Sequence, residues 1–537
     1  MDHNKKNGIY YTPEVLADFM TNYVLQSLDL KEPLNILEPS CGDGVFIKSL
    51  FKHEFLNKYS YNLEIVEKNN REINKAKKIY IELTNSNNEI EDSITCYNMD
   101  YLIFHKQNNK RYDLIIGNPP YIKRKYLSQK QIQLCEEILK KNNFDNKIMN
   151  IWIAFILSVN MFLKDKGVLF FVLPAEILQV NYAKKVRKIL NKSFDRIEIF
   201  AFNELVFPNI EQDVILFLGV KRSKTKGIVF HLIDNLSDLK EVRQISEKDY
   251  HSKSDDKWTK YILSKDDLHL LDKLKINLKL VKEYCQSQVG IVTGANDFFI
   301  INKDEVEKYN LEKYAMAILK KSSFFPKGVK FTKNDFSKIF NKNKRCNLLF
   351  FDKEEFKAFD NEAKLYLKKG VEEEIDRKYK CKKRTLWYKV PSVWKSEAMF
   401  FKRSHLYPKL VLNQAEVLVT DTAYRIRMHE PYDIKSFIFC FYNSLTLAFT
   451  ELIGRYYGGG VLELTPNEFK RLPIPYFEFS EDKFLKLDKM FREGYDLDQI
   501  LDYTDTIILS KKLGIDELTL KKIKSLRKKL SFRRRKI

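Results

Sequence analysis

The residues best suited to do chemistry are Asn118, Pro119, Pro120 and Tyr121, which directly follow an apolar run at 112–116. Because prolines lack the backbone donor that a central strand needs, the chain must leave the sheet here as a rigid loop. The Asn118 side-chain oxygen and the Pro119 carbonyl oxygen can converge on one planar amine, such as that of adenine, and stabilise the charge that develops when it takes a methyl group. The Tyr121 ring offers a face on which a base can stack. The alternative is an ordinary turn stiffened by proline.

A glycine-containing turn lies upstream, in segment 37–46. Gly42 and Gly44 would let the backbone pass close to a ligand, and the N-terminus of the helix that follows would favour a carboxylate. The spacing differs from the dinucleotide fingerprint G-x-G-x-x-G, so the turn alone does not identify its ligand.

Two acidic residues follow the next two expected strands. Glu67 could accept hydrogen bonds from both hydroxyls of a ribose, and Asp100 could accept one from the amine of a cofactor adenine. Each could instead be a solvated carboxylate at a strand end. The four signals nevertheless come in order, each at the carboxyl end of an expected strand, which is where open α/β sheets bind ligands.

The elements that must position these residues are apolar runs separated by amphipathic stretches, a pattern that predicts strand–helix units on a parallel sheet. The expected strands are 34–38, 63–67, a further one just ahead of residues 98–101, 112–116 and 167–173, with a closing pair at 197–202 and 213–220. The polar stretch 221–227 is either a boundary or a hairpin turn, and 251–257 is a better linker candidate. We therefore expect a doubly wound, Rossmann-like α/β domain.

This ordered set resembles the gamma class of amino-methylating DNA methyltransferases, which make N6-methyladenine in bacterial DNA. The segment 8–13 looks like the family's N-terminal motif, and the resemblance implies that Thr12 helps to hold the methionine carboxylate of S-adenosylmethionine. It also implies further cofactor contacts. They are Glu38, Ser40, Cys41 and Gly42 around the methionine part, Glu67 at the ribose, Asp100 with Tyr101 at the adenine, and Asn118 beside the methyl group.

The resemblance extends to the target base. Asn118 to Tyr121 match the catalytic loop of the family, and Val206-Phe207-Pro208 resembles the motif whose aromatic residue sandwiches a flipped base against Tyr121. The lysine expected in close relatives is missing from 209–212, and periodicity alone would equally make Phe207 a core aromatic before a strand. The match covers residues 1–220.

The C-terminal half resembles the DNA target-recognition domains fused to such enzymes, in segments 288–297, 456–464 and 469–475. The three glycines at 458–460 would either let backbone approach a phosphate or form a flexible connection. We expect a catalytic domain at 1–250, a separate mixed α+β target-recognition domain at 251–475, and a basic helical tail at 476–537.

The charge balance fits a polyanionic partner. The chain has 94 Lys and Arg against 72 Asp and Glu, a net charge of +22, which attracts nucleic acid; an A/T-rich genome would also enrich lysine. The basic stretches 123–125 and 527–536 either contact DNA backbone or are solvated. Seven cysteines without a C-x-x-C pair suggest neither a metal site nor disulfides. With no signal peptide and no apolar run of ~20 residues, we expect a cytoplasmic, DNA-associated prokaryotic protein without membrane contact.

The function expected from these observations is transfer of a methyl group from S-adenosylmethionine to the N6 amine of a flipped adenine in a specific duplex sequence, with S-adenosylhomocysteine as product and no metal. A separate restriction endonuclease is a possible partner. Methylation of a protein glutamine or an RNA guanine, which can use the same loop, is an alternative, as is a catalytically dead DNA-binding specificity protein. A bifunctional restriction–methylation enzyme is not expected, because no nuclease signature is present.

Overall fold

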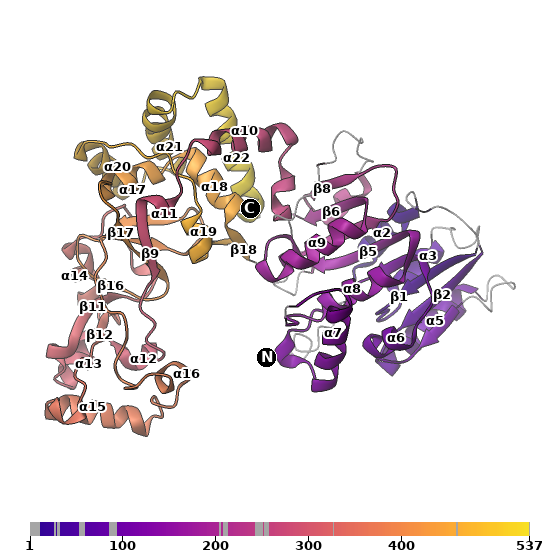
Figure 1. Cartoon of the computed structure of the whole chain (residues 1–537), viewed down its shortest axis with the longest axis horizontal. Helices are drawn as coiled ribbons and strands as arrows, with labels where there is room; N and C mark the ends of the chain where they lie inside the picture. Colours follow the sequence, from indigo (N-terminus) through magenta and orange to yellow (C-terminus); the bar gives the residue numbers. More distant parts are fainter. Residues whose placement is uncertain are drawn as a thin grey trace. The chain divides into compact units, whose positions relative to one another are not determined.

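A computed structural model describes residues 11–25, 28, 33–52, 60–84, 94–145, 147–202, 204, 206–207, 213–241, 251, 257–325, 327–457 and 460–535. The chain forms two compact units, unit 1 at Met1–His269 and unit 2 at Leu270–Ile537 (Figure 1). The domain boundaries proposed above remain predictions.

Unit 1 is built on an eight-stranded sheet of order β3-β2-β1-β4-β5-β7-β6-β8. Its strands are β1 (Leu34–Glu38), β2 (Tyr61–Val66), β3 (Ile94–Tyr97), β4 (Tyr112–Gly117), β5 (Leu163–Pro174), β6 (Arg196–Phe202), β7 (Val214–Val220) and β8 (Gly227–Ile233). The strands β1 to β5 run parallel, β7 lies antiparallel between β5 and β6, and β8 runs parallel to β6. The predicted doubly wound α/β fold is therefore confirmed. The segment 221–227 is neither a boundary nor a hairpin turn, because it leads to β8 on the far side of β6.

Helices connect and cover these strands. They are α2 (Glu14–Leu25), α3 (Val45–Lys52), α5 (Asn70–Thr84), α6 (Tyr101–Gln107), α7 (Gln129–Lys141), α8 (Trp152–Phe162) and α9 (Lys184–Ser193). The helix α8 is apolar and buried along almost its whole length, and every residue of β7 is buried. The core therefore runs through the centre of the sheet, and the strand ends around β1 and β4 are left to hold polar side chains.

Unit 2 is mixed α+β. It contains three small sheets, of order β10-β12-β11-β16, β15-β13-β17-β9 and β14-β19-β18. The strands are β9 (Cys285–Val289), β10 (Ile300–Ile301), β11 (Ala315–Leu319), β12 (Asn347–Leu349), β13 (Ala398–Phe401), β14 (Arg403–Ser404), β15 (Lys409–Leu412), β16 (Leu418–Val419), β17 (Ala423–Met428), β18 (Arg455–Tyr457) and β19 (Val461–Glu463). Helix α10 (Lys265–Ile276) begins in unit 1 and ends in unit 2. The helices that follow are α11 (Val281–Tyr284), α12 (Asn296–Phe299), α13 (Lys303–Lys308), α14 (Lys333–Asn341), α15 (Asn361–Glu372), α16 (Tyr379–Lys382), α17 (Ile434–Phe441), α18 (Ser444–Ile453), α19 (Pro466–Lys470), α20 (Glu481–Glu493), α21 (Leu497–Asp505) and α22 (Glu517–Arg535).

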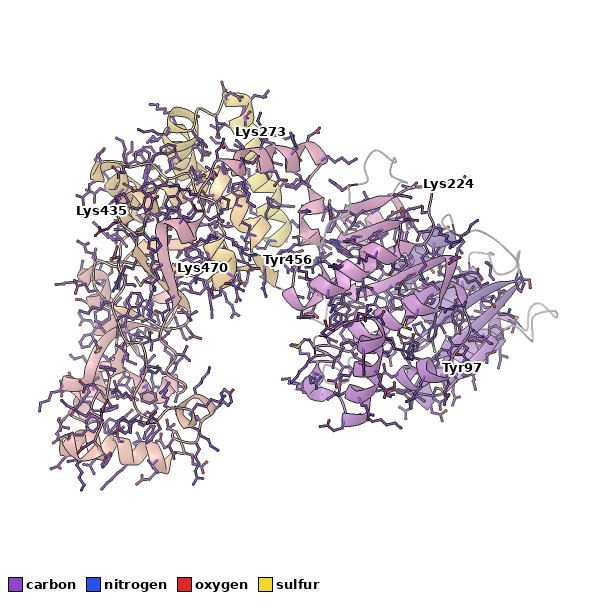
Figure 2. The ribbon with its side chains drawn as sticks, in the orientation of Figure 1. Tyr97, Lys224, Lys273, Lys435, Tyr456 and Lys470 are labelled. Carbon is purple, nitrogen blue, oxygen red and sulfur yellow. The ribbon has the colours of Figure 1, made fainter. Side chains whose placement is uncertain are left out.

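The basic C-terminal helix α22 packs into unit 2 instead of standing free. Arg534 forms an ion pair with Glu451 at 2.8 Å, and the two side chains are only 1% and 7% exposed. The Arg533 guanidinium lies 5.0 Å from the ring centre of Tyr456, which Figure 2 labels on β18. The sequence offered two alternatives for this segment, a tail that tracks DNA and a solvated helix end. Neither applies to Arg533 and Arg534, because these two arginines attach the helix to the rest of unit 2.

Among the described residues, no single helix is long and apolar enough to cross a membrane; the pair α17 and α18 reaches that length and composition only when taken together, across a bend of 77°.

Candidate active site

The carboxyl ends of β1, β2, β3 and β4 surround a cavity of about 150 Å³. Its lining includes candidate residues from the turn after β1, from the segments after β2 and β3, and from the loop after β4. These are Ser40, Gly42, Glu67, Asp100, Tyr101 and Asn118. The topology thus brings together groups that are distant in the sequence, as the 3.1 Å hydrogen bond from Ser40 Oγ to the Asn118 carbonyl oxygen, 78 residues away, shows.

The turn after β1 depends on its two glycines for different reasons. Both have a left-handed backbone, with φ of +51° at Gly42 and +88° at Gly44. A Cβ atom at Gly44 would come within 2.9 Å of the Ala76 Cα atom on α5, whereas one at Gly42 would meet no atom within 4 Å. Only Gly42 lines the cavity. Gly44 therefore serves the packing of helix α5; the expectation that its backbone also passes close to a ligand stays a prediction.

Glu67 and Asp100 are held by backbone and side-chain donors. The Glu67 carboxylate accepts from the Gly42 amide at 3.2 Å and from the Asn69 amide at 2.8 Å. Asp100 is the N-cap of α6, because one of its oxygens accepts from the Leu102 amide at 2.9 Å. Its other oxygen accepts from the side chain of Gln131 at 3.0 Å. Gln131 also lines the cavity, and no motif pointed to it.

Glu38 is a fully buried carboxylate at the end of β1. Neither of its oxygens has a hydrogen-bond partner within the described part of the chain. Burial raises the pKa of this carboxyl well above its usual range, and the nearby Asp43 and Glu67 raise it further. The carboxylates of Glu38, Asp43 and Glu67 lie near one another, and the two Glu38 oxygens have no donor. This arrangement favours a cationic ligand group.

The loop after β4 is tied to the N-terminal segment. The Asn118 side-chain nitrogen Nδ2 donates to the Thr12 hydroxyl at 3.2 Å, and the Asn118 side-chain oxygen accepts from the Tyr121 hydroxyl at 2.9 Å. The same Tyr121 hydroxyl lies 3.0 Å from the Val172 carbonyl oxygen on β5. A hydroxyl has one hydrogen to donate, so Tyr121 can turn to Val172 and release the Asn118 oxygen without losing a hydrogen bond.

An aromatic group closes the cavity beside Asp100. The Tyr101 and Phe155 rings lie 4.5 Å apart, and both line the cavity. The Tyr101 hydroxyl is paired with Ser158 at 2.7 Å, and Ser158 in turn lies 2.7 Å from His105 Nδ1. Burial lowers the pKa of His105 to about 4, so this network is neutral near pH 7. The sequence did not indicate Phe155, because α8 is apolar on all sides and none of its residues stands out as a site residue.

Six of the candidate residues are not part of the cavity lining: Thr12, Glu38, Cys41, Pro119, Tyr121 and Phe207. Cys41 is buried, and burial raises the pKa of its thiol. Tyr121 and Phe207 are buried as well, at 7% and 6% exposure. Residues 8–10 of the N-terminal motif, together with Pro208 and 209–212, lie outside the described residues. In the parts of the chain that the structure describes, no three His, Cys, Asp or Glu side chains group closely enough to hold a metal ion.

The sheet order of unit 1, its antiparallel β7 and a cavity at the carboxyl ends of β1 to β4 define the α/β class of S-adenosylmethionine-dependent methyltransferases. Comparison with known families narrows this class. Residues 27–207 match the family described as Eco57I restriction-modification methylase, and residues 255–509 match the C-terminal domain of the type II methyltransferase M.Eco57I. The chain belongs to the DNA methyltransferases of type II restriction–modification systems.

Two relatives in sequence agree with this assignment. The chain is 25% identical to the type II methyltransferase M.AccI of Acinetobacter calcoaceticus, over 95% of its own length and 94% of the relative. It is 26% identical to M.HincII of Haemophilus influenzae over 58% of each protein. Among solved structures, a nuclease-deletion mutant of the type ISP restriction-modification enzyme LlaGI, in complex with a DNA substrate mimic, gives a TM-score of 0.48 at 14% identity, covering 90% of this chain and 54% of that one.

Proposed function

We propose that the protein transfers the methyl group of S-adenosylmethionine to the N6 amine of adenine in a specific duplex DNA sequence. The single observation that carries the proposal is the position of Asn118, which lines the cavity while its side-chain oxygen is held by a hydroxyl that has a second acceptor available. The proposal also rests on the family assignment, because the relatives are named as type II methyltransferases.

The residues that line the cavity, together with Glu38, Thr12 and Cys41 next to them in the sequence motifs, fit the cofactor. When bound, S-adenosylmethionine supplies a methyl group activated by a sulfonium centre. The unsatisfied oxygens of Glu38 suit the positively charged ammonium group of its methionine part. Glu67 suits the ribose hydroxyls, since each of its oxygens has spare acceptor capacity beyond one backbone donor. Asp100 can accept from the adenine amine in the same way, beside the rings of Tyr101 and Phe155. Thr12, Ser40, Cys41 and Gly42 complete this proposed site.

The loop 118–121 supplies the groups that act on the target. A stacked adenine cannot present its amine to a buried methyl donor, so the base must leave the duplex at a cost of a few kcal/mol. When Tyr121 donates to Val172, the Asn118 oxygen and the Pro119 carbonyl oxygen can accept from the amine, and they stabilise the charge that develops on nitrogen. Pro119 and Pro120 fix the backbone, and the rings of Tyr121 and Phe207 are proposed to stack on the base. Solvent can take the proton after transfer.

Unit 2 offers a basic surface for the DNA backbone. Six of the eight residues from Arg377 to Arg384 are basic and none is acidic. Tyr379 in this segment is 68% exposed, with the Lys383 ammonium 4.2 Å from its ring centre. Arg384 fastens the segment to the body by donating to the carbonyl oxygens of Val292 and Thr293 at 3.0 and 2.7 Å. Lysines and arginines arranged in this way bind phosphates independently of sequence. Lys123 and Lys125, both exposed, are candidates for the same role in unit 1.

The direct test supplies labelled S-adenosylmethionine with duplex DNA, RNA or protein, and identifies the product base by mass spectrometry. We expect N6-methyladenine in duplex DNA alone. Label in RNA or protein, or a methylated cytosine, would contradict the proposal, as would cofactor binding without transfer to any of the three substrates.

The matched variant is Asn118→Ala, which should lower the rate of transfer by at least about 10²-fold, a typical cost of removing one such acceptor or donor. Cofactor binding, measured by calorimetry, should change little, because the contacts to the methionine and ribose parts come from other residues. Normal turnover by this variant would remove Asn118 from the reaction.

A separate restriction endonuclease that cuts the same sequence is the proposed functional partner, since the relatives belong to restriction–modification systems. Such a pair would act in the cytoplasm of a prokaryotic cell, where the DNA lies.

A further inference from the structure

One face of the sheet formed by β9 and β17 carries polar side chains in register. Gln286 lies directly opposite Arg427, and Gln288 lies directly opposite Arg425. Gln286, Gln288 and Arg427 are exposed, whereas Arg425 is buried. The strands lie next to each other in unit 2 (Figure 1), and β9 is the last strand of its sheet. This side of the sheet is therefore open to a partner.

A third exposed side chain extends the row. Glu397 comes one residue before β13, and its amide donates to the Ile426 carbonyl oxygen at 3.1 Å. Since Ala398 is paired with Ile426, the register places Glu397 opposite Arg427 on the other side from Gln286. Gln286, Arg427 and Glu397 form what we call the polar row, and they cross three neighbouring chain segments at a strand spacing of about 4.8 Å.

Trp394 provides a platform for the row. Its ring centre is 5.1 Å from the Arg427 guanidinium and 4.4 Å from that of Arg425. The indole Nε1 donates to the Gln288 side-chain oxygen at 3.2 Å. Stacking on an aromatic face limits the freedom of a long side chain, so Arg427 and Gln288 are oriented before any ligand arrives.

The charges at this face are not balanced within the protein. Arg425 is 1% exposed and donates only to neutral oxygens, those of the Ser392 and Val289 carbonyls and the Ser392 hydroxyl. For the residues that the structure describes, neither Arg425 nor Arg427 has a carboxylate oxygen within 4.0 Å, although Glu397 faces Arg427. Two guanidinium groups on one indole repel each other, and a partner rich in acceptor atoms would relieve that repulsion.

We propose that the polar row, with Gln288 beside it, reads base edges in the major groove of the DNA target; this rests on the proposed function. The three side-chain types are those that discriminate base pairs, because Arg pairs with the acceptors of guanine, Gln with the donor and acceptor of adenine, and Glu with the amine of cytosine. The major groove admits a two-stranded ribbon, and Gln286 and Arg427 lie on the two outermost strands at this end of the sheet, with Glu397 beside them. The basic segment 377–384 would grip phosphates instead and would carry no sequence information.

The test compares the sequence preference of the full chain with those of Gln286→Ala, Arg427→Ala and Glu397→Ala. In the first experiment, duplexes that the protein binds are selected from a random pool and sequenced. In the second, a random pool is incubated with the protein and S-adenosylmethionine, and the methylated sites are sequenced. Each variant should lose discrimination at one or two base pairs of the site by roughly 5- to 150-fold, the effect of one good side-chain–base pair. All three side chains are exposed, and thermal unfolding together with cofactor binding establishes that each variant is folded.

Arg377→Ala is the matched control, since it removes an exposed arginine of the same unit that lies outside the row. It should weaken binding to all sequences alike and make the salt dependence of binding shallower. If the variants of the polar row behave in the same way, they contact phosphates only and the inference is wrong. Unchanged binding and unchanged preference would overturn it too.

The two proposals fail in different ways. If the unaltered protein selects a sequence but transfers no methyl group, the proposed reaction fails while the reading of bases is still tested by the binding pool. If it methylates a defined site and the variants of the polar row keep that site, only the inference about these residues fails.

Discussion

At the scale of single residues, the site contains carboxylates whose oxygens accept hydrogen bonds from the protein and one carboxylate whose oxygens accept none. Glu67 and Asp100 each use both oxygens in hydrogen bonds to the protein, which fixes their orientation. Glu38 uses neither. Tyr121 has two acceptors for one hydrogen. These last two residues therefore respond most directly to a bound ligand, and both give testable predictions.

Tyr121→Phe separates the hydroxyl from the ring. Because the hydroxyl competes with the target amine for the Asn118 oxygen, its loss should leave the rate of transfer within about tenfold of normal. The free energy of unfolding should fall by about 1 kcal/mol, since one buried hydrogen bond is lost. Tyr121→Ala also removes the ring and should cost a further ~1–3 kcal/mol in binding of the target base. Single-turnover rates and denaturant unfolding measure the two effects; equal rates for the Phe and Ala variants would exclude stacking on Tyr121.

Glu38 should couple cofactor binding to pH. Its pKa is raised in the folded protein, so above the ordinary pKa of a glutamate the folded state holds a proton that the unfolded state has lost. The free energy of unfolding of the ligand-free protein therefore falls as pH rises from the pKa of Glu38 in the unfolded chain to its higher pKa in the folded protein. A cationic ligand favours the ionised form, and its binding should release a proton and become tighter as pH rises. Calorimetry in buffers of different ionisation enthalpy measures this release.

The control for that measurement is Glu38→Gln, which keeps the shape but cannot ionise. It should bind the cofactor more weakly and with less proton release. If both proteins release the same number of protons across the pH range, the linked group is not Glu38.

At the scale of elements, the turn between β1 and α3 shows how the helix layer fixes a glycine. Gly44→Ala should destabilise unit 1 by about 2–4 kcal/mol, since it adds a left-handed non-glycine residue and a clash with α5. Gly42→Ala carries the backbone cost alone, about 1–2 kcal/mol. Denaturant unfolding of the two variants checks the order; an equal loss would mean that α5 moves away at little cost.

The elements of unit 1 were predictable because buried parallel strands are short, continuous apolar runs. The runs at 34–38 and 112–116 coincide with β1 and β4, and those near 63–67, 167–173 and 197–202 with β2, β5 and β6. The strand β8 was missed. Its sequence, GIVFHLI, is a short apolar run like those of the other strands; what the sequence does not show is that its partner is β6 and not β7, its neighbour in sequence.

At the scale of the whole molecule, the basic C-terminal helix is a structural part of unit 2. Arg534→Ala leaves the buried Glu451 without its partner, and should lower the free energy of unfolding of unit 2 by about 3–5 kcal/mol. Lys529→Ala, an exposed position on the same helix, should change it by no more than about 0.5 kcal/mol. Thermal unfolding measured for both variants tests this role. A selective loss of DNA affinity by Arg534→Ala, at unchanged stability, would restore the DNA-tracking alternative.

The sequence by itself determined which segments form strands and which residue types follow them: glycines after β1, acidic residues after β2 and β3, and Asn-Pro-Pro-Tyr after β4. These follow from local rules of backbone freedom and hydrogen-bond donors, which neighbouring residues set. Only the tertiary structure decided that these ends share one cavity, that Gln131 and Phe155 join them, that Glu38 is buried without a partner, and that Arg425 and Arg427 share one tryptophan. Burial and pairing depend on residues distant in the chain, so no local pattern records them.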